Sequence, residues 1–546
     1  MHSCSRCGHI DRPHHLQPRE LCRVSKSHWC DVCAKLDYLN VKITRAQAAL
    51  QELFDQRDDL RTQLNQAHPS IVDRLPVEIA STIFTLYASN ISRTESPLIL
   101  GAVCQNWRQI AWTTPSVWMF LRFRSYTSRA ICSETRLQLV RDWLIRSKKT
   151  SLSIDLGTYS LKGGDGNIQQ VYHLVDIINQ HCDHWHSLDL HMPSFLLAHF
   201  NDTICDSSAL HTLSMASTDS SANDPDLTIP SLSRVSPKSV KIYGPLLNPH
   251  SLNWDRVTHL TLLPSAIDQI LQILRMGPAL QSCCFALSSS RSTIPVSETD
   301  SAVTHPLLHS LDIEAANDSL GLFFSNVTFP ALGELSIRGI DLHLQGQEFA
   351  SFLTRSSSGL KSLNVDEVTF TSEDFLRMIR LTPYLEELDI LLGSTDADVL
   401  TPFYQALANH LPANDGLLPQ LTRPLLPSLR AFGWMGDDAF PWEAIPRFFA
   451  PFSADDRTRR RPLEEITICC SLQAQDPIPY ISEDVISQLS EFANQVRFKF
   501  DVDIDGKVDD LWKLSLEKIE KKDEGSNVAQ SNLLYGYGYR QSDVIL

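Results

Sequence analysis

The chain has 546 residues, of which 43% are hydrophobic, and it carries a formal net charge of −16. That length exceeds one ordinary hydrophobic core, so two or more domains or a repeat array are expected. The hydrophobic content is typical of a folded protein, whereas the negative charge excludes non-specific binding to nucleic acid, which needs a basic surface.

The chain opens on polar residues rather than on an apolar leader, and no apolar run is long enough to span a bilayer. We therefore expect no membrane partner. The 13 cysteines, an odd number, are expected to be reduced thiols, which predicts a cytoplasmic or nuclear protein. The basic run at 457–461 is interpreted as a solvated loop, with a nuclear address as the alternative.

Residues 1–35 form a head that is rich in Cys and His and poor in apolar side chains. It contains two Cys-x-x-Cys pairs, a spacing with which one turn presents two thiolates to tetrahedral zinc. So small a head would need a metal to fold, which makes zinc a candidate cofactor. The alternative is an unstructured N-terminus with incidental cysteines. The candidate ligands are Cys4, Cys7, Cys30 and Cys33.

Residues 36–67 carry apolar side chains at alternating spacings of three and four, the a/d pattern of a coiled coil. The pattern is interrupted once, by Arg57. It predicts one long helix that either associates with a second copy or packs on its own protein. The apolar a and d positions are Leu36, Leu39, Ile43, Ala46, Leu50, Leu53, Leu60, Leu64 and Ala67.

Residues 70–121 predict three short helices whose apolar faces are too large to bury on one another. An excess of this size indicates a module that completes its core on a partner. The alternative is that the face docks on the rest of the chain. The residues that carry this interpretation are Leu75, Pro76, Ile79, Ile83, Phe84, Val103, Cys104, Trp107 and Trp118.

The Leu-Pro-x-Glu-Ile opening at 75–79, the Val-Cys-x-x-Trp helix at 103–107 and the Pro-x-x-Trp closure at 115–118 resemble an F-box. The form is similar to the expanded F-box families of mushroom-forming fungi, in which a further helix and a strand follow directly. A helical linker is accordingly expected at 122–147.

The resemblance implies that the face defined above docks on the small SKP adaptor of an SCF-type cullin-RING ubiquitin ligase. The chain would then be a substrate receptor and not itself an enzyme. One alternative is an F-box scaffold that binds proteins outside any ligase. Another is a zinc-head coiled-coil protein that oligomerises through residues 1–67.

From residue 149 to 500 the chain repeats the unit Leu-x-x-Leu-x-Leu or a near variant. Strand, loop and helix repeated in this way predict an α/β fold, a leucine-rich-repeat-like solenoid with an inner parallel sheet. The units look like the degenerate repeats of F-box proteins. A capping-box pattern at 371–374 predicts the start of one repeat helix. The clearest units start 24, 28 and 25 residues apart, at Leu308, Leu332, Leu360 and Leu385.

In each repeat strand, the residue between two inward apolar side chains is expected to face outward. Adjacent parallel strands would gather these residues into one polar, partly acidic row. Such a row predicts a surface for a basic or hydrogen-bonding segment of an unknown protein substrate. Simple solvation of the strand is the alternative. The row consists of Asp312, Ser336, Asn364 and Asp389.

The C-terminal part is predicted to hold a closing helix region at 501–524, with the helix itself at 508–520, and a disordered tail at 525–546. The acidic stretch at 501–506 matches the start of an EF-hand loop. Trp512 occupies the twelfth position, where a Glu is needed, so we predict a strand that ends in an acidic turn instead. No nucleotide-binding or hydrolase motif is present in the sequence.

Overall fold

A computed structural model divides the chain into two compact units. The N-terminal unit comprises Met1–Tyr87 and Leu98–Trp112, and the sheet unit comprises Ala88–Pro97 and Thr113–Leu546. The residues that the structure describes are 31–67, 75–89, 96–125, 134–158, 168–200, 210–218, 232, 235–244, 250, 252–287, 302–315, 319–356, 359–392, 397–408, 424–437, 439–452 and 459–527.

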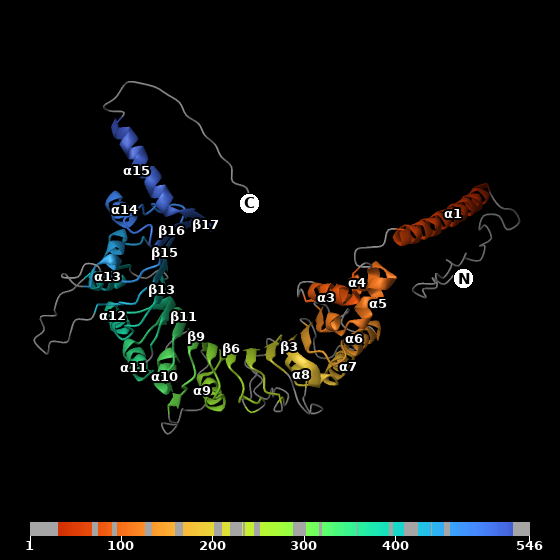
Figure 1. Ribbon diagram of the computed structural model, residues 1–546, viewed down its shortest axis with the longest axis horizontal. Helices are drawn as coiled ribbons and strands as arrows, with labels where there is room; N and C mark the ends of the chain where they lie inside the picture. Colours follow the sequence, from red (N-terminus) through yellow and green to blue (C-terminus); the bar gives the residue numbers. More distant parts are fainter. Residues whose placement is uncertain are drawn as a thin grey trace, which may run out of the picture. The chain divides into compact units, whose positions relative to one another are not determined.

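The described part of the N-terminal unit is helical (Figure 1). The long helix that the heptad pattern predicted is present, but it begins at Asp31, so the head was drawn too long at its C-terminal end. An acidic residue in the first turn stabilises a helix N-terminus, which favours this earlier start. The helices are α1 (Asp31–Ala67), α3 (Val77–Ala88), α4 (Ser96–Val103) and α5 (Gln105–Thr113).

The sheet unit is a mixed α/β structure. Among the described residues, 15 strands form one sheet in chain order, and all neighbours are parallel except the last pair, β16 and β17. The strands are β1 (Phe120–Ser125), β2 (Leu152–Thr158), β3 (Trp185–Met192), β4 (Thr212–Ser217), β5 (Ser239–Tyr243), β6 (His259–Ser265), β7 (Ser282–Leu287), β9 (Ser310–Ala315), β11 (Glu334–His343), β12 (Ser362–Thr369), β13 (Glu387–Leu392), β14 (Ala431–Gly436), β15 (Glu465–Leu472), β16 (Arg497–Ile504) and β17 (Lys507–Asp510).

Helices follow most strands and lie along the outer side of the curved sheet, which leaves the inner side as bare strands (Figure 1). Sequential parallel strands need such crossovers, because each chain must return to the starting edge before it pairs again. The helices of at least eight residues are α6 (Glu134–Ser147), α7 (Ile168–Asn179), α9 (Ile267–Met276), α10 (Ser319–Asn326), α11 (Gly346–Ser356), α12 (Ser372–Arg380), α13 (Thr401–Ala408), α14 (Glu483–Ser490) and α15 (Leu511–Asn527).

The core of the sheet unit lies between the strands and these helices. Leu311 and Ile313 of β9 are almost fully buried, and burial alternates along the strand as the period-two pattern predicted. The predicted helix start at 371–374 is also confirmed, since the Asp374 main-chain N–H donates to the Thr371 hydroxyl over 3.1 Å. Aromatic side chains from α10, α11 and the loop before β11 fill the centre of this layer: Phe323, Phe324, Phe329, Phe349 and Phe352.

The parallel sheet extends beyond 149–500, the range predicted for the repeats, at both ends. Residues 120–125, assigned partly to a helical linker at 122–147, form β1, which pairs with β2. At the other end, 501–504 continue β16, and the hairpin to β17 turns through Asp505 and Gly506, both at positive φ. The predicted strand with an acidic turn is thus confirmed. The closing helix runs from Leu511 to Asn527, so it begins and ends later than predicted. Most of the tail predicted at 525–546 lies outside the described residues.

Two predictions about side-chain environment hold for some residues and fail for others. Five of the described cysteines are free thiols, as expected, and Arg459 of the basic run is exposed. Cys182 is disulfide-bonded, although reduced thiols were expected; spacing along the chain does not reveal which thiols folding brings within bonding distance. Arg461, placed by the sequence in a solvated loop, is only 6% exposed. Its guanidinium donates to the main-chain carbonyls of Leu407, Leu425 and Phe448, which replace the lost water.

Candidate partner-binding surfaces

Helix α3 carries two apolar stripes. One consists of Ala80, Phe84 and Ala88 and is buried. The other is exposed and follows i, i+4, i+7 spacing, which places its members on one side of the helix: Ile79 at 49%, Ile83 at 45% and Leu86 at 69% exposure. An apolar stripe that remains in contact with water on a folded helix marks a surface available to another protein.

The next two helices extend this exposed apolar surface. Ile99 and Val103 of α4 are 47% and 55% exposed and lie one turn apart. The ring of Trp107, half-buried at the start of α5, lies 5.0 Å from the ring of Phe84. We name six of the exposed or half-buried apolar side chains of α3–α5 the helical face: Ile79, Ile83, Leu86, Ile99, Val103 and Trp107.

The turn between α4 and α5 is held by local contacts. The Trp107 main-chain N–H points at the Cys104 sulfur over 3.4 Å, and Arg108 donates to the Gly101 carbonyl over 2.8 Å. A side chain at Gly101 would overlap the ring of Trp112, so this position requires glycine for close packing. The indole nitrogen of Trp107 is buried and has no hydrogen-bond partner among the described residues.

Two of the predicted adaptor-binding residues cannot contact a partner. Phe84 is 1% exposed and lies behind the exposed stripe of α3. Trp118 is fully buried in the sheet unit, where its ring meets that of Trp143 at 5.0 Å. Its motif position suggested that it closes the helical module, but the aromatic partner on α6 buries it instead. Both residues therefore have a packing role.

The other predicted residues of this set lie at or near the surface. Pro76 is exposed and Leu75 is half-buried, as is Cys104. Leu86 and Ile99 were missed by sequence reasoning. Leu86 could have been found, because it follows Ile83 by three residues and thus shares its side of the helix. The short α4 offers too little periodicity to assign Ile99 to a face.

The predicted polar row on the sheet exists as a geometric feature. Ser336 is in register with Asp312 on one side and with Asn364 on the other, and Asn364 is in register with Asp389. All four residues stand between buried neighbours and are exposed or half-buried, on the side of the sheet opposite its buried apolar side chains. Whether a substrate binds there stays a prediction.

The row is less acidic than the sequence implied. The Asp312 carboxylate pairs with Arg338 of the neighbouring strand over 2.6 Å, so its charge is largely balanced. Asp389 has acidic neighbours instead. Partial desolvation, followed by the charges of Glu387 and Glu465, raises the pKa of Asp389. Its carboxylate occupies the space over Gly433 of β14, which a larger residue would fill.

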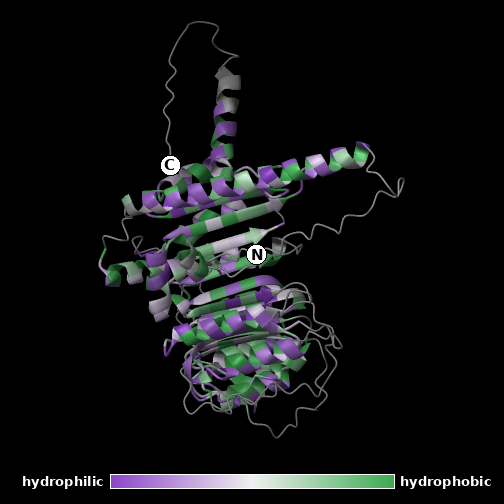
Figure 2. Cartoon of the chain, turned by 90° about the vertical axis from the view of Figure 1, so that its right-hand side faces the viewer, coloured by the Kyte–Doolittle hydropathy of each residue, from purple (hydrophilic) through white to green (hydrophobic). Residues whose placement is uncertain are grey.

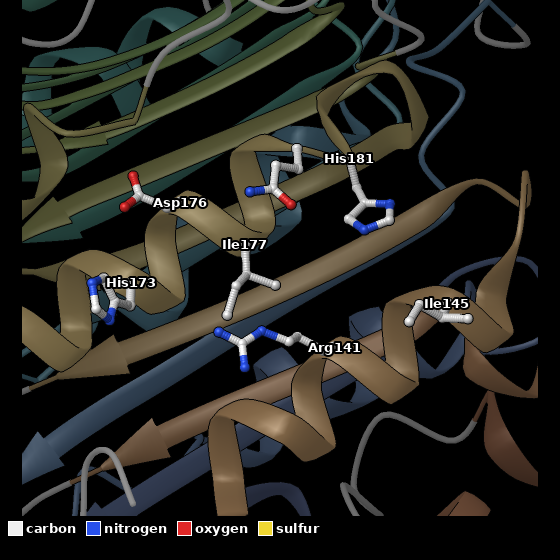
Figure 3. Close-up of a pocket in the computed structure, with 7 residues that line it drawn as sticks. Arg141, Ile145, His173, Asp176, Ile177 and His181 are labelled. Carbon is white, nitrogen blue, oxygen red and sulfur yellow. The ribbon is translucent and has the colours of Figure 1, made fainter. Parts of the chain in front are cut away.

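A shallow pocket of about 390 Å³ lies on the helical side of the sheet unit, between α6 and α7. Figure 3 shows Arg141 and Ile145 projecting from α6 towards His173, Ile177 and His181. Burial and the neighbouring His184 lower the pKa of His181, which favours its neutral form. The lining mixes basic, acidic and apolar side chains, so neither its charge nor its polarity indicates one class of ligand.

The predicted zinc ligands Cys4, Cys7 and Cys30 lie outside the described residues, and Cys33 falls within the first turn of α1. Across the part of the chain that the structure describes, no group of three or more His, Cys, Asp or Glu side chains is arranged to hold a metal ion. None of the helices described combines the length and the apolar character needed to cross a membrane.

Comparison with known proteins found no family model that matches the chain and no curated protein that is similar to it. The two surfaces are therefore interpreted from their own chemistry: an exposed apolar face on three short helices, and a polar row on a parallel sheet.

Proposed function

We propose that this chain is an F-box substrate receptor of an SCF-type cullin-RING ubiquitin ligase. The helical face binds the SKP adaptor, and the sheet unit, a degenerate leucine-rich-repeat solenoid, binds a protein substrate. The chain performs no chemistry itself. It raises the local concentration of substrate beside the ubiquitin-charged enzyme.

The observation that carries this proposal is the exposed apolar face at the motif positions. Ile79, Ile83 and Val103 are each about half exposed, although α3 and α5 also carry apolar side chains that are buried, such as Phe84 and Ile110. Leaving such residues in water lowers stability without benefit to the isolated chain. A partner that covers these side chains gains binding free energy of ~25 cal/mol for each Å² of apolar surface removed from water.

The substrate half of the proposal rests on the bare side of the sheet. Parallel strands normally have both faces covered, because crossover helices flank them. Here the helices occupy one side only (Figure 1). Residues in register, such as Ser336, Asn364 and Asp389, place polar groups on the other side. A long, polar, concave surface of this kind fits an extended segment of another protein.

The full-length chain co-expressed with an SKP adaptor tests this function. We expect a soluble one-to-one complex, and we expect Ile83→Asp to weaken it at least thirtyfold, equivalent to about 2 kcal/mol for loss of a central apolar contact. The matched control is Ile145→Asp on α6, because Ile145 is also an exposed isoleucine, at 66%, but lies in the sheet unit.

The outcome discriminates clearly. Ile83→Asp should abolish capture of adaptor and cullin while Ile145→Asp leaves both intact. If the wild-type chain and the adaptor do not associate at micromolar concentration, the ligase function is excluded. If both variants weaken binding equally, the helical face is not the adaptor site.

A further inference from the structure

Helix α1 carries an apolar seam that is exposed along its whole length. Every α1 side chain that the structure describes is exposed, and hydrophobic residues recur in short bands along the helix (Figure 2). Among the larger seam residues, exposure ranges from 51% at Leu50 to 63% at Leu60. A helix of 37 residues with such a stripe gains most of its stability when another apolar surface covers the stripe.

If a second copy of α1 covers the seam, the two seam positions that break the apolar pattern indicate how the two helices are oriented. Ala46 is too small to fill a layer, and Arg57 is large and charged. If two copies of α1 ran parallel, each residue would face its own counterpart. One layer would then hold two Arg57 side chains at close range, and another would hold two Ala46 side chains and be underfilled.

An antiparallel pair resolves both defects in a single register. When Arg57 faces Ala46 of the second copy, the large residue meets the small one. The two Arg57 side chains then lie 11 residues apart in this alignment, or about 16 Å, so their repulsion is largely screened. The remaining layers are also compatible: Leu36 with Ala67, Leu39 with Leu64, Ile43 with Leu60, and Leu50 with Leu53.

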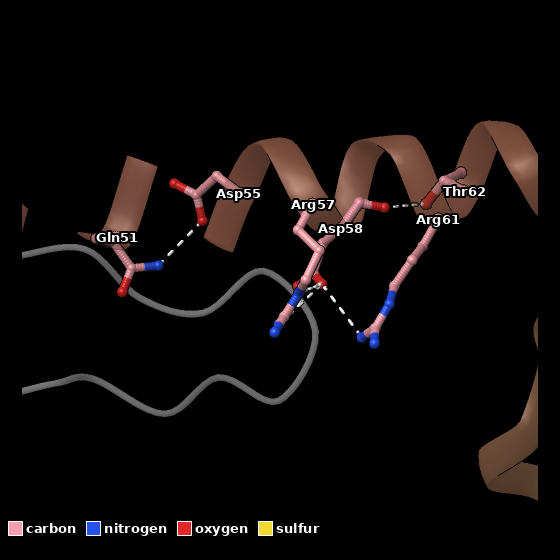
Figure 4. Close-up of polar contacts among 6 residues, drawn as sticks. All are labelled: Gln51, Asp55, Arg57, Asp58, Arg61 and Thr62. Carbon is pink, nitrogen blue, oxygen red and sulfur yellow. Dashed lines mark hydrogen bonds and ion pairs between the residues drawn. The ribbon is translucent and has the colours of Figure 1, made fainter. Parts of the chain in front are cut away.

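The position of the Arg57 side chain supports this register. Its guanidinium is held by Asp58, with contacts of 3.2 and 3.3 Å (Figure 4). It also lies 4.9 Å from the ring centre of Phe54. Asp58 also attracts Arg61, at 3.9 Å. The charge of Arg57 is thus balanced by its own helix and turned aside, which leaves its alkyl stem free to cover an alanine.

The flanks of the seam do not oppose this pairing. In the antiparallel register, the g positions of the two copies face one another, which sets Lys35 against Gln63 and Lys42 against Gln56. No lysine faces a lysine across these flanks.

We propose that α1 forms an antiparallel homodimer in which Arg57 of each chain packs over Ala46 of the other. The partner of this surface is a second copy of the chain. The inference is independent of the adaptor-binding function, since it uses no residue of the helical face. A dimer would carry two copies of every other binding surface, which raises avidity for a substrate with two recognition segments.

Sedimentation equilibrium of the full-length chain tests the dimer. We expect twice the chain mass of 61.5 kDa for wild type. Leu50→Asp places two carboxylates in the central layers and should raise the dimer dissociation constant about a hundredfold. The matched control Ala48→Asp adds the same charge on the outer side of the helix and should remain dimeric.

Disulfide trapping tests the orientation. A tagged Leu39→Cys chain is mixed with an untagged Leu64→Cys chain and oxidised, with wild-type chains as the background for native cysteines. We expect a mixed cross-linked species between the two variants. Leu39→Cys alone should not cross-link beyond background, because the antiparallel register separates its two copies by about 38 Å, far beyond disulfide reach.

Several results would overturn the proposal. A wild-type chain that sediments as a monomer at micromolar concentration excludes the dimer. Loss of dimer in both aspartate variants, or in neither, excludes the seam as the interface. Cross-linking of Leu39→Cys to itself, without cross-linking to Leu64→Cys, shows a parallel pair. Circular dichroism of each variant confirms that the helix persists, so a change in mass reports association.

Discussion

Trp143 of α6 donates its indole N–H to the main-chain carbonyl of Trp118 over 2.8 Å, and the two rings meet edge to face. This contact fixes the short 3-10 helix Pro115–Trp118 directly before the first strand of the sheet. The contact explains why Trp118, which the Pro-x-x-Trp motif assigned to the partner-binding surface, is buried and unavailable to a partner.

The first prediction concerns this contact. Trp143→Phe retains an aromatic ring but removes the hydrogen bond to the Trp118 carbonyl, so we expect a loss of about 0.5–1.5 kcal/mol in unfolding free energy. Urea denaturation measures it, with Leu139→Phe at the surface of α6 as the control. Adaptor binding should be unchanged. Weaker adaptor binding at unaltered stability would show instead that Trp118 contributes to the adaptor-binding surface.

Trp107→Phe tests the unpaired indole nitrogen. The buried Trp107 N–H lacks a partner among the described residues, so removing it should leave the melting temperature of the free chain unchanged or slightly raised. If a bound adaptor supplies the missing acceptor, the affinity of the variant falls about tenfold. A large drop in melting temperature would show instead that the indole stabilises the isolated fold.

Asp389→Asn should raise stability at neutral pH. The pKa of Asp389 is raised in the folded chain, so the folded state holds its proton more tightly, and ionisation on raising the pH lowers stability. The amide removes this effect and the repulsion from Glu387 and Glu465. Thermal melts should show a higher midpoint than wild type at pH 7. The difference should shrink as the pH falls through ~4, the ordinary pKa of Asp, and vanish about one unit lower, where the carboxyl is protonated in both states.

Asp312→Asn provides the contrast for that experiment. Asp312 is balanced by Arg338, so its neutralisation removes an attraction rather than a repulsion. We expect an unchanged or slightly lower midpoint at pH 7, since exposed ion pairs contribute ~0–1 kcal/mol. If Asp312→Asn and Asp389→Asn raise the melting midpoint equally, the acidic neighbours of Asp389 are not the cause of its stabilisation.

Substrate capture gives a prediction for the same row. Asp389→Lys reverses the charge beside Gly433 and should deplete basic proteins from the set that co-purifies with the full chain. Glu491→Lys at the end of α14 makes the same charge change away from the row and should leave the set unaltered. An unchanged set in both variants would mean that recognition lies elsewhere.

Arg461→Met should be strongly destabilising. Burial lowers the pKa of Arg461 to about 10, yet its guanidinium stays protonated at pH 7 and donates to three main-chain carbonyls. Removing these donors leaves the carbonyls unsatisfied, at a cost of about 3 kcal/mol or more in total. Arg459→Met, at an exposed neighbouring position, is the control for chemical denaturation. Equal effects would indicate that Arg461 is not a structural arginine.

The sequence by itself determined the local features of the fold. Alternating burial in β9, the capped start of α12 and the long helix α1 all follow from period and spacing, which act between residues close in the chain. The polar row could be predicted for the same reason, because an outward position is set by the strand that carries it, and parallel pairing then aligns successive copies.

Only the tertiary structure decided which side chains remain available. Trp118 is covered by Trp143, 25 positions further along the chain, and Asp312 pairs with Arg338, 26 positions further along. Arg461 donates to the carbonyl of Leu407, 54 positions earlier. Such partners are chosen by how the chain packs, so spacing within a motif cannot reveal them. The exposed stripe of α3 is the converse case: its composition was readable in the sequence, but whether folding would cover it depended on every other element of its unit.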